Sequence, residues 1–363
     1  MKIERLEVSI YRIPTDRPEA DGTFHWDSTT LVLVEAVADS GLRGLGFSYT
    51  AAAAGRLIED LLTEAVVGRP LEHIGAAWEA MVRAVRNIGL PGVAATAISA
   101  VDTALWDLRA CAVGLPLFHL LGIYRDRVPI YGSGGFTTYG ETELVEQLAG
   151  WVEQGISKVK MKVGKDWGTK QEEDLVRVSA VHKAVGSDAE LLVDANGAYS
   201  VKQAIDMSQR FADQGVTYFE EPVPFDHLDQ LAFIRQHSPI AIASGEYGYS
   251  AYDFRDVLKA EAVDILQADA TRCLGITGCL QAAALAHAYG IPFSTHTAPS
   301  IHAHVCCAFP QIEHLEYFHD HVRIENMLFE GVLQPQEGHL RPDPGRPGLG
   351  LQLKTSDAQR WRL

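Results

Sequence analysis

The chain divides into two regions that differ in the spacing of their hydrophobic positions. Near the N-terminus, residues 2–12 and 29–37 alternate or run apolar as strands do, and residues 41–46 resemble a turn leading into a third strand. Apolar residues recur at helical spacing in residues 56–85 and, with many small Ala positions, in residues 96–113. We therefore predict a small antiparallel sheet packed against helices.

The segment between the first two predicted strands, residues 14–28, has a different texture. It is rich in Asp, Pro, Gly and aromatic residues. Such a segment is too long and too polar for a tight hairpin, so we predict a mobile loop. A loop of this kind could close over a functional site.

After Gly122 the pattern changes to short apolar runs separated by amphipathic helices. The runs are residues 128–131, 158–163, 190–193, 218–219, 240–243, 265–267 and 291–294. The predicted helices are residues 142–154, 170–185, 201–214, 227–236, 252–259 and 277–287. Seven or eight such strand-helix units close a parallel barrel. The Gly- and Pro-rich tail from Gly331 is expected to be an extended segment that wraps back on the body.

Composition and charge narrow the class of protein. A chain of 363 residues is long enough for a barrel of about 250 residues and a smaller domain. The net charge of -16 argues against binding to nucleic acids or anionic membranes, which attract basic surfaces. No apolar run resembles a signal core or a membrane span, so we expect a cytoplasmic protein acting on small molecules. The five scattered cysteines suggest neither disulfides nor a zinc site.

Chemically active residues follow the predicted strands at nearly constant intervals. Asp194, Glu220, Glu246, Asp269 and His296 are separated by 26, 26, 23 and 27 residues. In a parallel barrel the carboxyl ends of the strands converge on one rim. These residues are therefore expected to share one pocket.

Three of these residues suggest a metal site. Asp194, Glu220 and Glu246 offer oxygen ligands from rigid strand ends, and such ligands suit Mg²⁺. Glu221 is an alternative to Glu220, because alternate strand residues face opposite ways and only one of the pair can face the metal.

Lys160 and Lys162 lie two residues apart on a predicted strand and so point to the same side. They could be a solvated strand end or a phosphate contact. Close to one another and to Mg²⁺, however, their ammonium forms are disfavoured, and we expect a pKa lowered toward the range of a general base.

His296 and Asp269 follow neighbouring predicted strands. An Asp that holds one imidazole nitrogen fixes the tautomer and raises the basicity of the other nitrogen. Glu316 ends the next short apolar run and can reach the same rim. An alternative metal site could be built from histidines, namely His296, His302, His304 and His314. We disfavour it because residues 300–304 are expected to form the first turn of a helix.

Over essentially its whole length the chain resembles the enolase superfamily, in its mandelate racemase subgroup. Residues 97–107 (AISAVDTALWD) with Gly114-Leu115-Pro116 look like the first family signature. Asp194-Ala195-Asn196-Gly197 with Glu220-Glu221-Pro222 look like the second.

The resemblance implies an α/β fold: a modified TIM barrel, (β/α)₇β, with an α+β N-terminal capping domain. The implied divisions are residues 1–125 for the cap, with the loop 14–28 as its lid, and 126–330 for the barrel. Residues 331–363 would return to the capping domain.

The resemblance also implies a role for each rim residue. One Mg²⁺ per subunit would be bound by Asp194, Glu220 and Glu246, with Glu221 beside them. Lys162 would be a base and Lys160 its companion at the substrate carboxylate. His296 with Asp269 would form a dyad on the opposite face, and Glu316 an acid that hydrogen-bonds the carboxylate of the intermediate.

The implied reaction begins with removal of a proton α to a carboxylate, giving an enediolate, as enolase-superfamily sites do with a Lys or His base. We favour dehydration of a sugar acid, an aldonate or aldarate, to a 2-keto-3-deoxy acid, because the predicted lid is polar. The alternative is a racemase or epimerase of a 2-hydroxy acid that uses both bases.

Two further alternatives remain, a metal-dependent hydrolase and a non-catalytic family member. A hydrolase would want HxH on the first barrel strand, which residues 129–133 lack. We expect a small carboxylate substrate and a homo-oligomer. The expected substrate contacts are His25, Ser133, Asn196 and Arg272.

Overall fold

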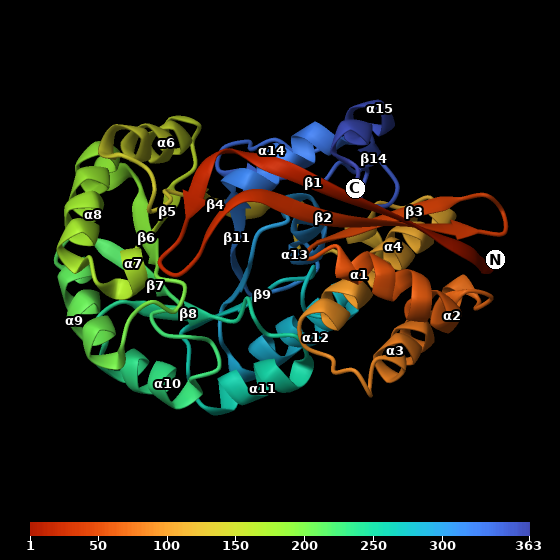
Figure 1. Ribbon diagram of the computed structural model, residues 1–363, viewed down its shortest axis with the longest axis horizontal. Coiled ribbons are helices and arrows are strands. Elements are labelled where there is room, and N and C mark those ends of the chain that lie inside the picture. Colours follow the sequence, from red (N-terminus) through yellow and green to blue (C-terminus); the bar gives the residue numbers. More distant parts are fainter.

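The structure, a computed structural model, describes residues 1–363. Its N-terminal part is a three-stranded antiparallel sheet, in the order β1-β2-β3, packed against helices (Figure 1). The strands are β1 (Ile3–Ala20), β2 (His25–Ala38) and β3 (Arg43–Tyr49). The helices are α1 (Ala53–Leu57), a π-helical turn (Ile58–Leu62), α2 (Thr63–Val66), a 3-10 turn (Leu71–His73), α3 (Ile74–Ala84), α4 (Val93–Val113) and α5 (Leu117–Leu121).

The prediction of a loop at residues 14–28 is wrong. β1 and β2 continue through this segment as a long antiparallel hairpin, with a short turn after Ala20 and a break in register between Pro14 and Glu19. In Figure 1 this hairpin, in red, reaches from the capping helices across to the barrel. Most of residues 14–28 are exposed or half-buried, and many are polar, so this part of the hairpin carries little hydrophobic signal.

Two glycines allow β3 to lie directly on α4. A Cβ on Gly44 would be 2.2 Å from the Leu108 nitrogen, and one on Gly46 would be 2.3 Å from the Ala100 carbonyl oxygen. The predicted turn at residues 41–46 therefore ends early, and its last residues belong to the strand that packs on α4.

The second part confirms the predicted barrel. Eight parallel strands run in the order β4 to β11, and β11 pairs with β4 to close the ring. The strands are β4 (Val128–Gly134), β5 (Lys158–Lys162), β6 (Glu190–Asp194), β7 (Val216–Glu220), β8 (Ala241–Ser244), β9 (Ile265–Ala268), β10 (Phe293–Thr295) and β11 (Ile312–Phe318).

Helices surround the barrel on its outer side (Figure 1). They are α6 (Glu141–Glu153), α7 (Lys165–Gly168), α8 (Gln171–Val185), α9 (Val201–Ala212), α10 (Leu228–His237), α11 (Ala251–Lys259), α12 (Gly275–Tyr289), α13 (Pro299–Cys306) and α14 (His319–Leu328). A capping box, in which Ser200 and Gln203 bond reciprocally to backbone groups, begins α9.

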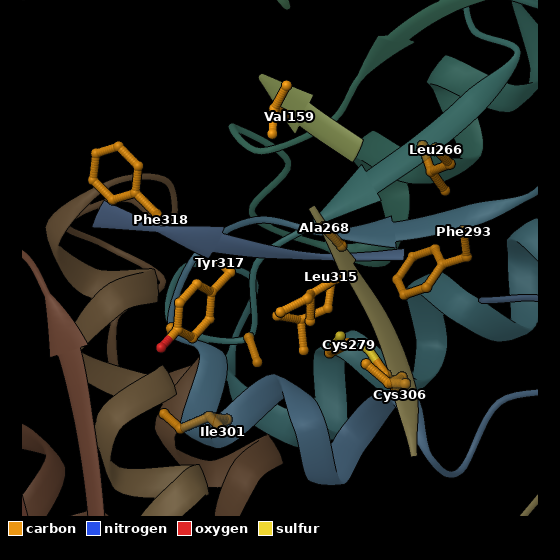
Figure 2. Close-up of a cluster of buried hydrophobic side chains, with 14 of the residues drawn as sticks. Val159, Leu266, Ala268, Cys279, Phe293, Ile301, Cys306, Leu315, Tyr317 and Phe318 are labelled. Atoms are coloured by element: carbon orange, nitrogen blue, oxygen red, sulfur yellow. The ribbon is translucent and has the colours of Figure 1, made fainter. Parts of the chain in front are cut away.

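The core between barrel strands and outer helices fixes which residues face inward. Figure 2 shows Leu315 and Tyr317 of β11 on the side of Ile301 in α13. Side chains alternate along a strand, so His314 and Glu316 face the barrel interior instead. Outer packing of β11 therefore directs the Glu316 carboxylate toward the rim.

The C-terminal tail contacts both parts of the molecule. It contains β12 (Phe329–Glu330), β13 (His339–Leu340), β14 (Gln352–Leu353), α15 (Thr355–Ala358) and a last turn (Gln359–Trp361). β13 pairs with β4, and the final amide, of Leu363, donates to the Ile10 carbonyl of β1. None of the helices is both long and apolar enough to cross a membrane.

Candidate active site

The strand register aligns the first residues of the site. Lys162 at the end of β5 is the neighbour of Asp194 on β6, and Asp194 is the neighbour of Glu220 on β7. All three close their strands, so their side chains meet at one level of the barrel mouth. The sequence spacing of one strand-helix unit produces this alignment.

Three buried carboxylates form a cluster that fits a cation. Ligand oxygens of Asp194, Glu220 and Glu246 lie within 4.8 Å of one another, and Oε2 of Glu246 has no hydrogen-bond partner. Burial raises the pKa of Glu220 to about 8 despite the nearby Lys160 ammonium. The raised pKa shows that burial disfavours the charge of Glu220, and a bound cation would favour it. The all-oxygen donor set of the cluster suits a hard divalent ion.

Glu221 lies outside this cluster. Its backbone has a left-handed φ of 40°, which turns the chain at the strand end, and its Oε1 accepts from Ser244 at 3.3 Å. The strand alternation thus separates the two glutamates, as expected for a pair in which only one faces the metal.

Both lysines are buried against these acids. Lys160 Nζ lies 2.7 Å from Glu220 and 2.9 Å from Glu316, and Lys162 Nζ lies 2.5 Å from Asp194. These contacts show that the two lysines do not form a solvated strand end. A phosphate contact is also disfavoured, because carboxylates already hold both ammonium groups.

The expected lowering of a lysine pKa does not follow from the protein groups alone. Burial disfavours the charged amine of Lys162, but the carboxylates of Asp194, Glu316 and Glu246 together outweigh it and raise the pKa above its ordinary value. Glu220 and Glu316 raise the pKa of Lys160 in the same way against burial. The acids offset the repulsion between the lysines, which the sequence argument took to dominate.

His296 and Asp269 form a buried pair at the ends of β10 and β9. His296 Nδ1 lies 2.8 Å from Asp269 Oδ2, and Nε2 lies 3.3 Å from Glu246 Oε2. Burial opposes ionisation of Asp269, but the hydrogen bond and charge of His296 hold its pKa well below the usual range. Against the same burial, Glu246 and Asp269 raise the pKa of His296.

Glu316 connects the two sides of the rim. Its Oε1 accepts from Ser133 Oγ at 2.6 Å, and its Oε2 accepts from the Thr297 amide at 3.0 Å. Burial disfavours its charge, but Lys160 and His296 lower its pKa. Ser133, expected as a substrate contact, is fully buried and holds Glu316 instead.

A cavity of about 520 Å³ opens above these residues. Lys162 and His296 both line it, together with Asn196 and Arg272, which were expected to contact substrate. Asn196 Oδ1 is buried without a partner, whereas Arg272 donates to Glu246 at 3.0 Å.

The hairpin forms part of the cavity wall. Asp21, Phe24 and Trp26 line the cavity, whereas His25 is exposed and lines a separate outer hollow. Alternation along β2 separates His25 from Trp26, because neighbours on a strand point to opposite faces. Asp21 and Phe24 precede β2 and line both hollows. The expectation that His25 contacts substrate is therefore not supported.

The alternative histidine cluster does not form a metal site. His302 accepts from the Ala270 amide through Nε2, and His304 lies 3.2 Å from the Leu349 carbonyl. His314 lies inside the barrel against the ring of Tyr131. Each contact is structural, and the three histidines point to different places.

Tyr49 and His321 line the cavity and are among the lining residues that the sequence did not indicate. The Tyr49 and His321 rings stack with centroids 3.4 Å apart. Tyr49 ends β3 and His321 lies in the first turn of α14, so only the docking of cap on barrel brings them together. No local pattern could have indicated this pair. Asp21, which also lines the cavity, lies in the segment that the sequence analysis associated with a lid.

Two family descriptions match the chain and together span most of it. Residues 7–122 match the mandelate racemase / muconate lactonizing enzyme N-terminal domain. Residues 143–358 match the enolase C-terminal domain-like family.

Similar proteins extend this finding. L-talarate/galactarate dehydratase of Salmonella typhimurium is 30% identical, over 99% of this chain and 91% of its own length. A mandelate racemase/muconate lactonizing enzyme-like protein from Rubrobacter xylanophilus is 49% identical, with a TM-score of 0.97 and 100% coverage of both chains. A racemase from Streptomyces coelicolor, solved with bound magnesium, is 30% identical, with a TM-score of 0.94 and coverage of 99% and 100%. Other relatives are named as dehydratases or cycloisomerases.

Proposed function

Because the chain belongs to the enolase superfamily, in its mandelate racemase subgroup, we propose that it is a Mg²⁺-dependent acid-sugar dehydratase. It would remove the proton α to the carboxylate of an aldonate or aldarate and expel the β-hydroxyl, giving a 2-keto-3-deoxy acid. The observation that carries this proposal is the placement of two candidate bases around one carboxylate cluster.

The two bases stand at different ends of that cluster. Lys162 contacts Asp194 at 2.5 Å, His296 lies 3.3 Å from Glu246, and both side chains line the same cavity. A carboxylate substrate bound at the cluster would have a nitrogen of the protein near each side of its α-carbon. Removal of a proton from one side and delivery of a proton from the other needs this arrangement.

Asp194, Glu220 and Glu246 would hold Mg²⁺. When bound, the ion supplies positive charge beside the substrate carboxylate, which favours the enediolate over the parent acid. Relatives support this assignment, because neighbouring structures contain Mg together with L-glucarate.

The chain's own groups would divide the remaining work. Lys162 or His296 takes the α-proton, depending on the configuration of the substrate, and Asp269 keeps Nε2 of His296 free to accept it. Protonated His296 can then give its proton to the departing hydroxyl. Lys160 and Glu316 would lie at the carboxylate, one as a fixed positive charge and one as a hydrogen-bonding acid.

The cavity wall favours a hydroxyl-rich substrate over an aryl one. Only six of its twenty lining residues are hydrophobic. Asp21 and Asn196 offer oxygens, and Arg272 offers donors, at positions where sugar hydroxyls would lie. The relatives named as dehydratases of arabinonate, galactarate and galactonate support the same class of substrate.

A second candidate is isomerisation, either racemisation or cycloisomerisation. The facing pair of bases also suits exchange of the α-proton between the two sides without loss of a leaving group. The magnesium-bound racemase and the relatives named as cycloisomerases favour keeping this candidate.

A screen of aldonic and aldaric acids with Mg²⁺ tests both candidates. Formation of 2-keto acid indicates dehydration, and α-deuterium incorporation in D₂O without keto acid indicates isomerisation. If the folded protein gives neither product nor exchange with any acid in the panel, the proposed reaction is wrong.

A further inference from the structure

A second cluster of metal-ligating groups lies outside the cavity. It comprises Asp16 and Glu19 on β1 and His319, the first residue of α14, and their ligand atoms lie within 4.8 Å of one another. Asp16 and His319 are in direct contact, with Oδ2 and Nε2 3.1 Å apart. The cluster therefore joins the hairpin to the barrel at the end of β11.

The irregularity in β1 brings the two acids together. In a regular strand, residues three apart face opposite sides. The β1–β2 register breaks between Pro14 and Glu19, so the intervening residues leave the ladder. Such breaks redirect side chains, and here the break lets Asp16 and Glu19 converge on His319.

Glu19 supplies an independent indication of a ligand. Its side chain is fully buried, yet Oε1 has no hydrogen-bond partner. Oε2 accepts from Trp26 Nε1 at 2.7 Å. A buried carboxylate oxygen without a partner is costly, and burial raises the pKa of Glu19 to about 8. A cation at Oε1 would remove that cost.

No neighbouring cation hydrogen-bonds to this oxygen. Asp320 adds negative charge. Arg323 is near enough to act on the charge of Glu19, but its Nη2 donates to Asp320 and to the Pro14 carbonyl, and its Nε has no hydrogen-bond partner. Arg17 pairs with Glu143. Asp16 and His319 are the metal-ligating side chains whose ligand atoms lie within 4.8 Å of a Glu19 oxygen.

We propose that Asp16, Glu19 and His319 bind a second divalent ion, of the borderline transition-metal class to which Zn²⁺ and Co²⁺ belong. One imidazole and two carboxylates are ligands for that class, and three protein ligands leave a position for water. The all-oxygen cluster at the barrel mouth differs, because it suits Mg²⁺.

A bound ion would fasten the hairpin over the cavity. Glu19 is the cross-strand neighbour of Trp26, and Trp26 lines the cavity. Holding Glu19 against His319 would therefore hold the indole in place. This role concerns the position of the β1–β2 hairpin over the cavity, and it does not depend on whether the proposed dehydration is correct.

Titration of the full chain with Co²⁺ tests the proposal, read by equilibrium dialysis and by visible absorption, in excess Mg²⁺. The comparison is between wild type, Glu19→Gln and His319→Asn. His227→Asn is the matched control. His227 is exposed and lies 4.0 Å from one carboxylate, that of Asp226, which is itself exposed. Circular dichroism shows that each variant is folded.

We expect Glu19→Gln and His319→Asn each to bind one equivalent of Co²⁺ fewer than wild type and to lose the associated absorption band. His227→Asn should match wild type. The proposal is overturned if the folded Glu19 and His319 variants bind as many equivalents as wild type, or if His227→Asn loses the same equivalent.

Discussion

Replacing Asp269 with Asn should disable one of the two proposed bases without removing it. Asp269 Oδ2 lies 2.8 Å from His296 Nδ1, and Oδ1 accepts from the Thr271 amide at 2.7 Å. An Asn side chain has one acceptor oxygen and one NH₂ group. If the Asn oxygen keeps the hydrogen bond from the Thr271 amide, the Asn NH₂ group faces His296 Nδ1. Nδ1 must then accept a hydrogen bond, so the imidazole proton moves to Nε2. In that tautomer Nε2 cannot accept the substrate proton.

The contacts set the size of the effect. Losing a hydrogen bond to a charged group costs about 1.5–3 kcal/mol. Turning the Asn amide would restore the original His296 tautomer, but the Asn NH₂ group would then face the Thr271 N–H, and two buried donors without an acceptor cost about 1–3 kcal/mol. The combined penalty of roughly 2.5–6 kcal/mol corresponds to a rate lowered by about 10²- to 10⁴-fold.

The assay is α-deuterium incorporation in D₂O, followed by proton NMR, with two acids that are epimers at the α-carbon. In Asp269→Asn, exchange of the epimer that uses His296 should fall by the stated factor, and exchange of the epimer that uses Lys162 should stay near the wild-type rate. Asp264→Asn is the matched control, because Asp264 precedes the same strand, β9, at its opposite end and accepts from Arg235 and the Ile242 amide. Equal losses for both epimers, or unchanged exchange in Asp269→Asn, would show that the dyad has no such role.

Further variants test other parts of the structure. Lys162→Ala should produce the converse pattern, lowering exchange of the other epimer by about 10²- to 10⁴-fold, and loss of both epimers would contradict two independent faces. Mg²⁺ at a hundred times its Kd should stabilise the wild-type protein by about 2.7 kcal/mol, seen as a raised melting temperature, and Glu246→Gln should abolish most of that rise. Burial raises the pKa of Glu325 to about 8, so the unfolded chain loses this proton before the folded chain does. Glu325 should therefore contribute a fall in stability of at most about 1.4 kcal/mol per pH unit as pH rises from 4.5 to 8, and Glu325→Gln should remove this contribution, giving a shallower slope than wild type in melts across this range. In Gly22→Ala the new Cβ would lie 2.7 Å from the Ala195 carbonyl and 2.8 Å from the Val163 carbonyl, so the hairpin tip should lift, raising KM and speeding limited proteolysis near residue 22; unchanged values of both would mean that the tip is not docked in solution.

The barrel and its rim could be predicted because both follow from local patterns repeated along the chain. Each short apolar run marks a buried strand, and the residue that ends it lies at the mouth whatever the loops do. Lys162, Asp194 and Glu220 needed only this rule, and their alignment in the sheet agrees with it. Spacing alone did not decide between Glu220 and Glu221, since either could have ended the strand.

The charge state of the lysines could not be predicted from the same pattern. The spacing placed two ammonium groups together, and their repulsion was expected to lower a pKa. The spacing did not reveal how close the carboxylates of Asp194, Glu220 and Glu316 would lie to these ammonium groups. Those carboxylates raise the lysine pKa values, where a lowering was expected. Energies of buried charges depend on distances of a few ångströms, which a strand pattern does not specify.

The hairpin escaped prediction for a different reason. Hydrophobic alternation reports a strand only where one face is regularly buried, and most of residues 14–28 are exposed or half-buried. The phase of the alternation in β2 was also hidden, and that phase decides that Trp26 faces the cavity while His25 faces outward. The break in register after Pro14 cannot be seen without the partner strand.

The position of this hairpin explains how one barrel could serve different acids. The groups proposed to move protons stand on barrel strand ends, where each is held by its neighbours and by the packing behind the strand. Asp21, Phe24 and Trp26 instead come from a ribbon attached to the cap and held at its tip by Gly22, whose carbonyl accepts from the Trp167 amide at 2.9 Å. A substitution on the ribbon therefore changes the cavity wall while the distances among Lys162, His296 and the carboxylates stay the same. Selectivity among sugar acids of one α-configuration should accordingly shift with the cavity-facing residues of β1 and β2. A substitution of one base on the rim should instead lower turnover equally for all acids of the α-configuration that uses this base.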